Sequence, residues 1–194
     1  MTLFLILLFS IMLTSRKSFR DAETKYFWLT VIVCLLLVLE DILELLASKD
    51  PSLRFFRILL SVLGYTLRSV AALSLLLVIL PPEKRRFVLW VPSLITRLSC
   101  GTAFLTDWAF GFDEDYAFYR GPLGYVAFIV PLFYMLLILY ITFRRFSEKN
   151  GAAKFIVPAC MLFCLAATVK GVLHGGTALD EAIISSSIFF YIVL

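Results

Sequence analysis

The sequence predicts an all-α fold, a bundle of seven helices that cross a membrane. Hydrophobic residues make up 61% of its 194 residues, and the mean hydropathy is +0.96. Because each crossing uses roughly 20 apolar residues, little chain remains for a soluble domain. We therefore expect a single transmembrane domain over residues 1–194, located in the cell membrane, with the lipid bilayer as its surroundings.

Seven apolar stretches, separated by charged residues or prolines, define the predicted helices. They cover residues 1–14, 26–47, 55–80, 87–110, 122–143, 155–173 and 182–194. The first and last are short for a span. The first has neither a basic leading region nor a cleavage site of small residues, so we do not expect a cleaved signal peptide. The last ends with the chain at Leu194, which favours a truncated helix.

Lysine and arginine cluster on alternate connections between the predicted helices. Eleven lie after the first, third and fifth helices, and four lie on the other connections. The positive-inside rule then places the N-terminus outside and the C-terminus in the cytoplasm. The net charge of +4 is explained by this topology and by anionic lipid of the inner leaflet, so we expect no nucleic-acid partner.

Six charged residues within four of the predicted helices are singled out, because charges are costly there. They are Glu40, Asp41, Glu44, Arg68, Arg97 and Lys170. Each costs roughly 2.5 to 3.5 kcal/mol at such depth, so we expect them to face the bundle interior and to pair. Two interpretations stay open. The groups form structural ion pairs that fix helix register, or they line an outward-opening pocket that binds a small polar ligand. An ion or proton path is less favoured, because the fifth and seventh helices carry no acid.

No metal site, cofactor or catalytic residue is expected. The four cysteines all fall within predicted helices and are interpreted as small apolar fillers. Cys160 and Cys164 share a helix face, but the lone histidine, His174, is ten residues further on and no further ligands lie near. No serine and histidine pair or paired inward aspartates lie at matching depth, so an intramembrane enzyme is not favoured.

The connection before the fifth predicted helix combines aromatic and charged residues. It reads FDEDYAFYRGPL from Phe112, and the residues singled out are Asp113, Asp115, Tyr119, Arg120, Gly121 and Pro122. The acids lack the further oxygen ligands and the glycine of an EF-hand, so we expect a solvated loop with an internal aspartate to Arg120 pair. Proline is suited to the first position of a helix.

This motif, followed by a long helix ending in Arg144-Arg145, resembles the N-terminal multi-helix input region of bacterial sensor histidine kinases and diguanylate cyclases. The resemblance covers residues 26–194. It implies that the chain senses an external or membrane signal and passes it through the last helix to a cytoplasmic output domain in cis. No kinase or GGDEF-type domain is present in this sequence, so we expect no enzymatic activity.

Other functions are kept as alternatives. A small transporter or channel is the main one, although the sequence shows no convincing internal repeat and no acid deep in the cytoplasmic half. The oligomeric state is also open, with a homodimer among the candidates.

Overall fold

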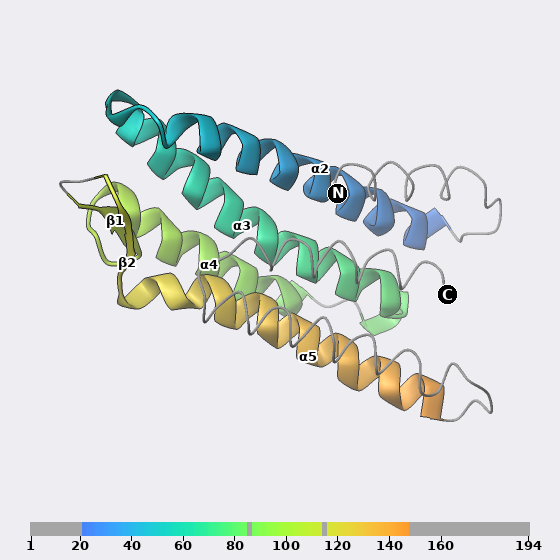
Figure 1. Cartoon of the computed structure of the whole chain (residues 1–194). Helices are drawn as coiled ribbons and strands as arrows, with labels where there is room; N and C mark the ends of the chain where they lie inside the picture. The colour runs from blue at the N-terminus through green and yellow to red at the C-terminus, as the bar shows by residue number, and fades with distance from the viewer. Residues whose placement is uncertain (1–20, 85–86, 114–115, 148–194) are drawn as a thin grey trace.

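The computed structural model describes residues 21–84, 87–113 and 116–147. Four helices and a two-stranded hairpin make up this part of the chain (Figure 1). They are α2 (Asp21–Ala47), α3 (Arg54–Ile79), α4 (Val91–Gly101), β1 (Phe110–Phe112), β2 (Phe118–Arg120) and α5 (Val126–Ser147). The predicted helices over 1–14, 155–173 and 182–194 lie outside the described residues. The structure is thus mostly helical, and four of the seven predicted helices can be compared with it.

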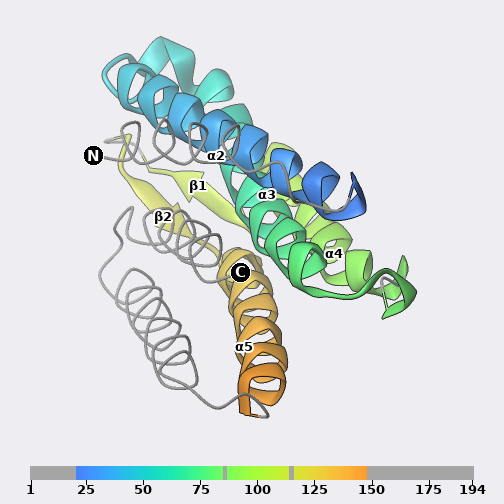
Figure 2. The ribbon, with the colours of Figure 1, turned by 90° about the vertical axis from the view of Figure 1, so that its right-hand side faces the viewer.

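Helix α3 is the centre of the described bundle. It packs along α2 and also contacts α4 and α5 (Figure 2). All residues from 69 to 80 are buried, whichever side of the helix they occupy. Its C-terminal half packs with Val130, Tyr134 and Ile138 of α5 in the largest apolar cluster. A helix that is apolar all round belongs in the interior of a bundle, which agrees with this central position.

Three helical stretches are long and apolar enough to cross a membrane. They are Pro51–Ile79, Phe87–Phe104 and Pro122–Ile141, each including short 3-10 turns next to the α-helix. The composition of these stretches is that of a membrane protein, as the hydropathy predicts.

The fourth predicted helix is shorter than expected, and the connection after it is not purely a loop. Helical structure ends at Phe104 instead of at Phe110, and β1 pairs antiparallel with β2. The strand places Phe110 and Phe112 in buried positions, 1% and 3% exposed. Backbone groups that a longer helix would satisfy internally are satisfied by strand pairing instead. The all-α prediction is therefore corrected by this one hairpin.

A tight crossing of the backbone follows the hairpin. The Gly121 amide donates to the carbonyl oxygen of Ala109 at 3.0 Å. A side chain at Gly121 would collide with the backbone carbonyl of Trp108. Only glycine allows this approach. Pro122 then opens the 3-10 turn that leads into α5, as the Gly-Pro pattern predicts.

The two ends of the bundle differ in character. At one end lie the hairpin and the α2–α3 turn, where the Asp50 carboxylate accepts from the Ser52 amide at 2.9 Å. This hydrogen bonding lowers the pKa of Asp50. The opposite end is where α2 begins and where α3 and α5 end (Figure 1). Near these helix ends lie the exposed basic residues Lys25, Lys84 and Arg144. The helices thus bring basic residues from three separate connections to one end.

Candidate functional site

Charged and small polar residues occupy the facing sides of α2 and α3 near the hairpin. On α2, Glu40 and Glu44 are one turn apart, and on α3 a stripe with spacings of four, three and four faces them. The members of the α3 stripe are Arg57, Ser61, Gly64 and Arg68. Residues at such spacings share one face of a helix. We call these residues, together with Asp41, the charged seam.

Glu40 lies at the deepest point of the charged seam. Its side chain is 1% exposed, and its Oε2 is 3.8 Å from Nη2 of Arg68. The space for its carboxylate comes from Gly64, because a Cβ built there would lie 2.5 Å from Cδ of Glu40. A buried carboxylate needs such a cation close by, since desolvation penalises an isolated charge severely. Gly64 and Arg68 therefore create the position that Glu40 occupies.

Arg68 connects Glu40 to the surface of the bundle. Its Nη2 is also 3.4 Å from Oδ1 of Asp41, whose side chain is 32% exposed. The guanidinium carbon lies 5.3 Å from the centre of the Tyr65 ring. Arg68 thus contacts one buried carboxylate, one partly exposed carboxylate and an aromatic ring, which together restrict its orientation.

Glu44 and Arg57 form the part of the charged seam next to the hairpin. The Arg57 Nε atom is 4.0 Å from Oε1 of Glu44, and the Ser61 hydroxyl donates to the same oxygen at 3.4 Å. Arg57 also donates from Nη1 to the Tyr116 carbonyl at 3.0 Å, and its guanidinium lies 4.4 Å from the centre of the Phe112 ring. One side chain therefore contacts both α2 and the hairpin.

A second arginine and a tyrosine strengthen the attachment of the hairpin. Arg54 donates from Nη2 to the Phe112 carbonyl at 3.1 Å. The Tyr116 hydroxyl donates to the carbonyl of Ala47, at the end of α2, over 3.5 Å. Tyr116 itself has a φ of 63°, a left-handed conformation that a tyrosine seldom adopts. The hairpin is therefore held at its turn by the start of α3 and the end of α2.

An open groove of about 430 Å³ lies beside the outer part of the charged seam. It is lined by Asp41, Ile42, Glu44, Leu45, Ser48 and Arg57. The side chains of Asp41 and Glu44 are 32% and 30% exposed, so both carboxylates reach solvent while they contact arginines. Such a mixture of apolar wall and polar groups suits a small polar ligand.

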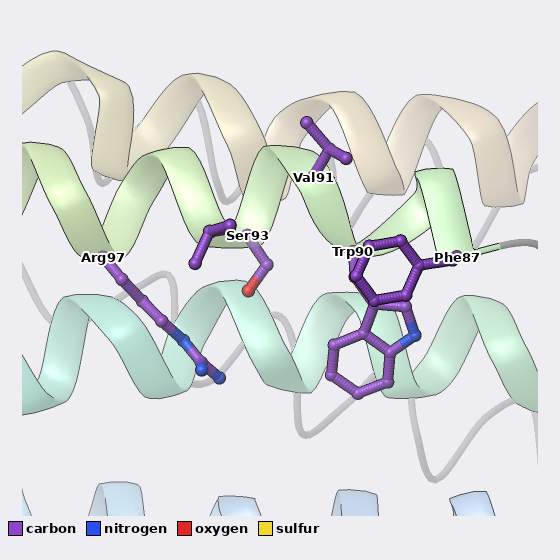
Figure 3. Close-up of a pocket in the computed structure, with 6 residues that line it drawn as sticks. Phe87, Trp90, Val91, Ser93 and Arg97 are labelled. Atoms are coloured by element: carbon purple, nitrogen blue, oxygen red, sulfur yellow. The ribbon is translucent and has the colours of Figure 1, made fainter.

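The other two basic residues predicted for this cluster are not brought into it. Arg97 is exposed on α4 and lines a separate groove with Phe87, Trp90 and Ser93 (Figure 3). Among the described residues, no carboxylate forms an ion pair with Arg97. Lys170 lies outside the described residues. The structure thus gathers Glu40, Asp41, Glu44 and Arg68, and places Arg97 elsewhere.

The motif residues before α5 shape the hairpin. Asp113 accepts from the Ala117 amide at 2.8 Å, and Arg120 lies with its guanidinium carbon 4.5 Å from the centre of the Phe128 ring. No ion pair joins Asp113 to Arg120 in the described part of the chain, and the predicted pair between an aspartate of this motif and Arg120 stays a prediction. Asp113 instead hydrogen-bonds within the hairpin turn, and Arg120 packs on the ring of Phe128. Asp115 lies outside the described residues.

Tyr119 is the most exposed residue of the hairpin strands. Its side chain projects outward, and the residue is 41% exposed. A hydrogen bond to the Asp107 carboxylate raises the pKa of Tyr119, because the negative charge disfavours the phenolate. The hydroxyl stays protonated at physiological pH and serves to connect β2 to the segment after α4.

No candidate metal centre is found in residues 21–84, 87–113 and 116–147, where no group of three or more potential ligands converges. Cys34 on α2 and Cys100 on α4 are both buried. The chemistry that the charged seam offers is therefore charge recognition and ion-pair exchange.

Arg54 and Arg57 were missed in the sequence as site residues, because they adjoin the α2–α3 turn and were counted as connecting residues. A signal for Arg57 was nevertheless present. It precedes Arg68 by eleven residues, close to three helical turns, so both fall on the face that carries Ser61. The signal for Arg54 lies in the hairpin contact, which the sequence does not reveal.

Comparisons of the chain with protein-family models, with curated proteins and with solved structures find no match. Any functional conclusion therefore depends on the residues and the geometry described above.

Proposed function

We propose that this chain is the membrane-embedded input module of a bacterial signalling receptor. It has seven membrane-spanning helices, with the N-terminus outside and the C-terminus in the cytoplasm. The hairpin end faces the outside, and the last helix relays the signal to a cytoplasmic output domain that is not among these 194 residues.

The observation that carries the proposal is the continuity of the charged seam with the hairpin. Arg57 contacts Glu44 on α2 and also the Tyr116 carbonyl in the hairpin turn. Further along α3, Arg68 contacts the buried Glu40. A change in the hairpin or in the groove therefore alters ion pairs that determine how α2 sits against α3.

The sensing step is a shift between two arrangements of these helices. A polar ligand in the groove competes with Arg57 for Glu44 and with Arg68 for Asp41. Ligand binding shifts the population only when the two arrangements bind the ligand with different affinity. Exchange of ion-pair partners between the arginines and the carboxylates supplies this difference in affinity. In each arrangement different charged side chains are left unpaired in the groove, and these are the ones that the ligand can bind.

The membrane orientation is tested by labelling. Single cysteines introduced at Asp113 and at Lys84, in a background with the native cysteines replaced, are treated with a membrane-impermeant maleimide in intact cells. We expect labelling at position 113 and none at position 84 until the membrane is permeabilised. Labelling at both positions, or the reverse pattern, would refute the proposed orientation.

The relay is tested on the natural gene. Its sequence downstream of Leu194 is read first, and an in-frame output domain is expected. The activity of that domain is then measured in membranes for Arg57→Gln and Arg68→Gln, with Lys84→Gln as the matched control at the opposite end. We expect both seam variants to change basal output while the control does not. A stop codon after Leu194, or unchanged output from properly folded seam variants, contradicts the proposal.

Transport is the alternative that one assay separates from sensing. Purified protein in liposomes should pass no ions or small solutes if it is a sensor. Sustained flux, lost in Glu40→Gln, would favour a small transporter or channel instead.

A further inference from the structure

A second groove lies on α4, away from the charged seam. It has a volume of about 190 Å³ and is lined by Phe87, Trp90, Val91, Ser93, Leu94 and Arg97 (Figure 3). Five of these six residues are apolar or small, and the sixth, Arg97, carries a full positive charge. The groove lies on the stretch Phe87–Phe104, which is long and apolar enough to cross a membrane.

The groove lies on the outer surface of the described part of the bundle. Phe87 is 81% exposed and Leu94 51% exposed, and only 22% of this span is buried. In a bilayer, an exposed face of this composition contacts lipid chains. Its apolar residues are therefore suited to hydrocarbon, whereas Arg97 is not.

The charge of Arg97 requires an anion at a defined depth. Seven residues separate Arg97 from Phe104, so it lies roughly 10 Å from the hairpin end of the span. No carboxylate of the described residues is within ion-pair distance. In Figure 3 the Arg97 side chain runs along the groove toward Ser93, and because it is exposed and long it can also turn toward the headgroup level of the nearer leaflet. A lipid phosphate is an anion available there.

The wall behind the groove is fixed by hydrogen bonds. Ser93 is 1% exposed, and its hydroxyl lies 3.0 Å from that of Ser69 on α3. The Ser93 amide donates to the Tyr134 hydroxyl of α5 at 3.1 Å, and this hydroxyl donates to the Leu89 carbonyl at 2.6 Å. Three helical segments thus hold the groove in place before any ligand arrives, which lowers the ordering cost of binding.

We infer that this groove binds an anionic phospholipid from the leaflet at the hairpin end. The headgroup phosphate pairs with Arg97, and one acyl chain extends along Leu94 toward Trp90. The distance from Arg97 to Trp90 is roughly 10 Å along the helix, which is less than the half-thickness of the hydrocarbon core. Charge complementarity selects the headgroup, and the apolar wall accepts any saturated chain. This inference requires only that the segment spans a membrane, not that the chain is a sensor.

Trp90 provides a reporter inside the groove. Trp28→Phe and Trp108→Phe together leave Trp90 as the only tryptophan. The protein is reconstituted in phosphatidylcholine vesicles that contain a small fraction of lipid brominated near the end of the acyl chain, either phosphatidylglycerol or phosphatidylcholine. Bromine quenches tryptophan fluorescence only on close contact. We expect the anionic lipid to quench Trp90 at a roughly fivefold lower mole fraction than the neutral lipid, as one phosphate contact of an arginine implies.

Variants assign this preference to one side chain. Arg97→Gln should equalise quenching by the two lipids, whereas Arg144→Gln, which removes an exposed arginine at the opposite end, should leave the preference intact. If Arg97→Gln does not fold, competition serves in its place: unbrominated phosphatidylglycerol should restore Trp90 emission, and unbrominated phosphatidylcholine at the same fraction should not.

Three outcomes would overturn the inference. The first is equal quenching of the wild-type reporter by both lipids. The second is a preference that survives in folded Arg97→Gln protein. The third is an absence of quenching by either lipid, which would show that protein covers the groove, either a second copy or another segment of the chain.

Discussion

Helices α2 and α3 meet in two different ways along one interface. Near the hairpin they face each other through the charged seam, with the buried Glu40 against Gly64 and Arg68. Further along, Val33, Cys34 and Leu37 of α2 pack against Val70 and Ala71 of α3 in an apolar cluster. One half of the α2–α3 interface is therefore held together by ion pairs, and the other half by close packing of apolar side chains.

The difference indicates which half can change. Apolar helix surfaces in a membrane gain little from leaving lipid, so close packing and hydrogen bonds hold the apolar half. The arrangement there is fixed because any displacement opens a void. Ion pairs in the charged half can exchange partners, and two of its carboxylates already reach solvent. We therefore expect the apolar half to act as the fixed part and the charged half as the movable part.

The largest expected effect comes from Arg68→Leu. This change removes the cation beside a carboxylate that is 1% exposed. Loss of one partner of a buried pair costs about 3 kcal/mol, and we expect that decrease in the free energy of unfolding. Unfolding by SDS titration in mixed micelles measures it.

A double variant tests whether the cost arises from the stranded charge. Adding Glu40→Gln to Arg68→Leu removes the carboxylate's charge, so more than half of the lost stability should return. A double variant that is as unstable as Arg68→Leu alone would mean that Arg68 acts through packing rather than through its pair with Glu40.

Leu37→Ala is the matching change in the apolar half. Leu37 is fully buried at 0% exposed, in the cluster with Val70 and Ala71. Truncation leaves a cavity and should lower the free energy of unfolding by about 2 kcal/mol. The same titration measures this loss. Because no charge is involved, the decrease should not depend on pH between pH 5 and 8, and a strong dependence would contradict the division into two halves.

Gly64→Ala should have an intermediate effect that is confined to the charged half. The added methyl group would overlap the Glu40 carboxylate, which is the mobile end of a side chain and can move at a cost of about 1 kcal/mol. Alanine otherwise favours a helix over glycine, which offsets part of this cost. We expect a small loss of stability in the wild-type background and no further loss when Gly64→Ala is added to Glu40→Ala, measured by SDS titration.

The sequence predicted the helical class and most of the charged seam, because hydropathy and helical spacing are local properties. The i, i+4 relation between Glu40 and Glu44 is visible in the sequence, and so is the cost of Arg68 in an apolar stretch. Which helix faces which is not local. Arg97 satisfied the same criteria as Arg68, yet it lies on α4, which packs against α3 and α5 and is held there by hydrogen bonds of Ser93 with Ser69 and Tyr134.

The hairpin could not be predicted for a related reason. Its strands are only three residues each, and the residues Phe110 to Phe112 continue an apolar run that also suits a helix. What favours the strand is the burial of aromatic rings against α3, including a Tyr65 to Phe110 contact with ring centres 5.7 Å apart. Such tertiary contacts outweigh local preference in short segments.

The smallest expected effect is that of Thr30→Val, which removes the one interhelical hydroxyl contact described in the apolar half. The Thr30 and Ser74 hydroxyls lie 2.8 Å apart. Each is also placed to donate within its own helix, to the carbonyl of Tyr26 at 3.0 Å and of Ala71 at 2.8 Å. Each hydroxyl has one proton, so a contact between them competes with an intrahelical bond.

Interhelical hydrogen bonds in membranes contribute about 0.6 kcal/mol on average, and Thr30→Val should cost no more than this. Ser74 keeps its acceptor at Ala71, and valine fills nearly the same volume. The comparison of halves predicts that Thr30→Val and Arg68→Leu, measured side by side by SDS titration, differ several-fold in their cost. Equal costs would mean that hydroxyl pairing holds the apolar half as firmly as charge holds the other, and the proposed fixed and movable halves would lose their physical basis.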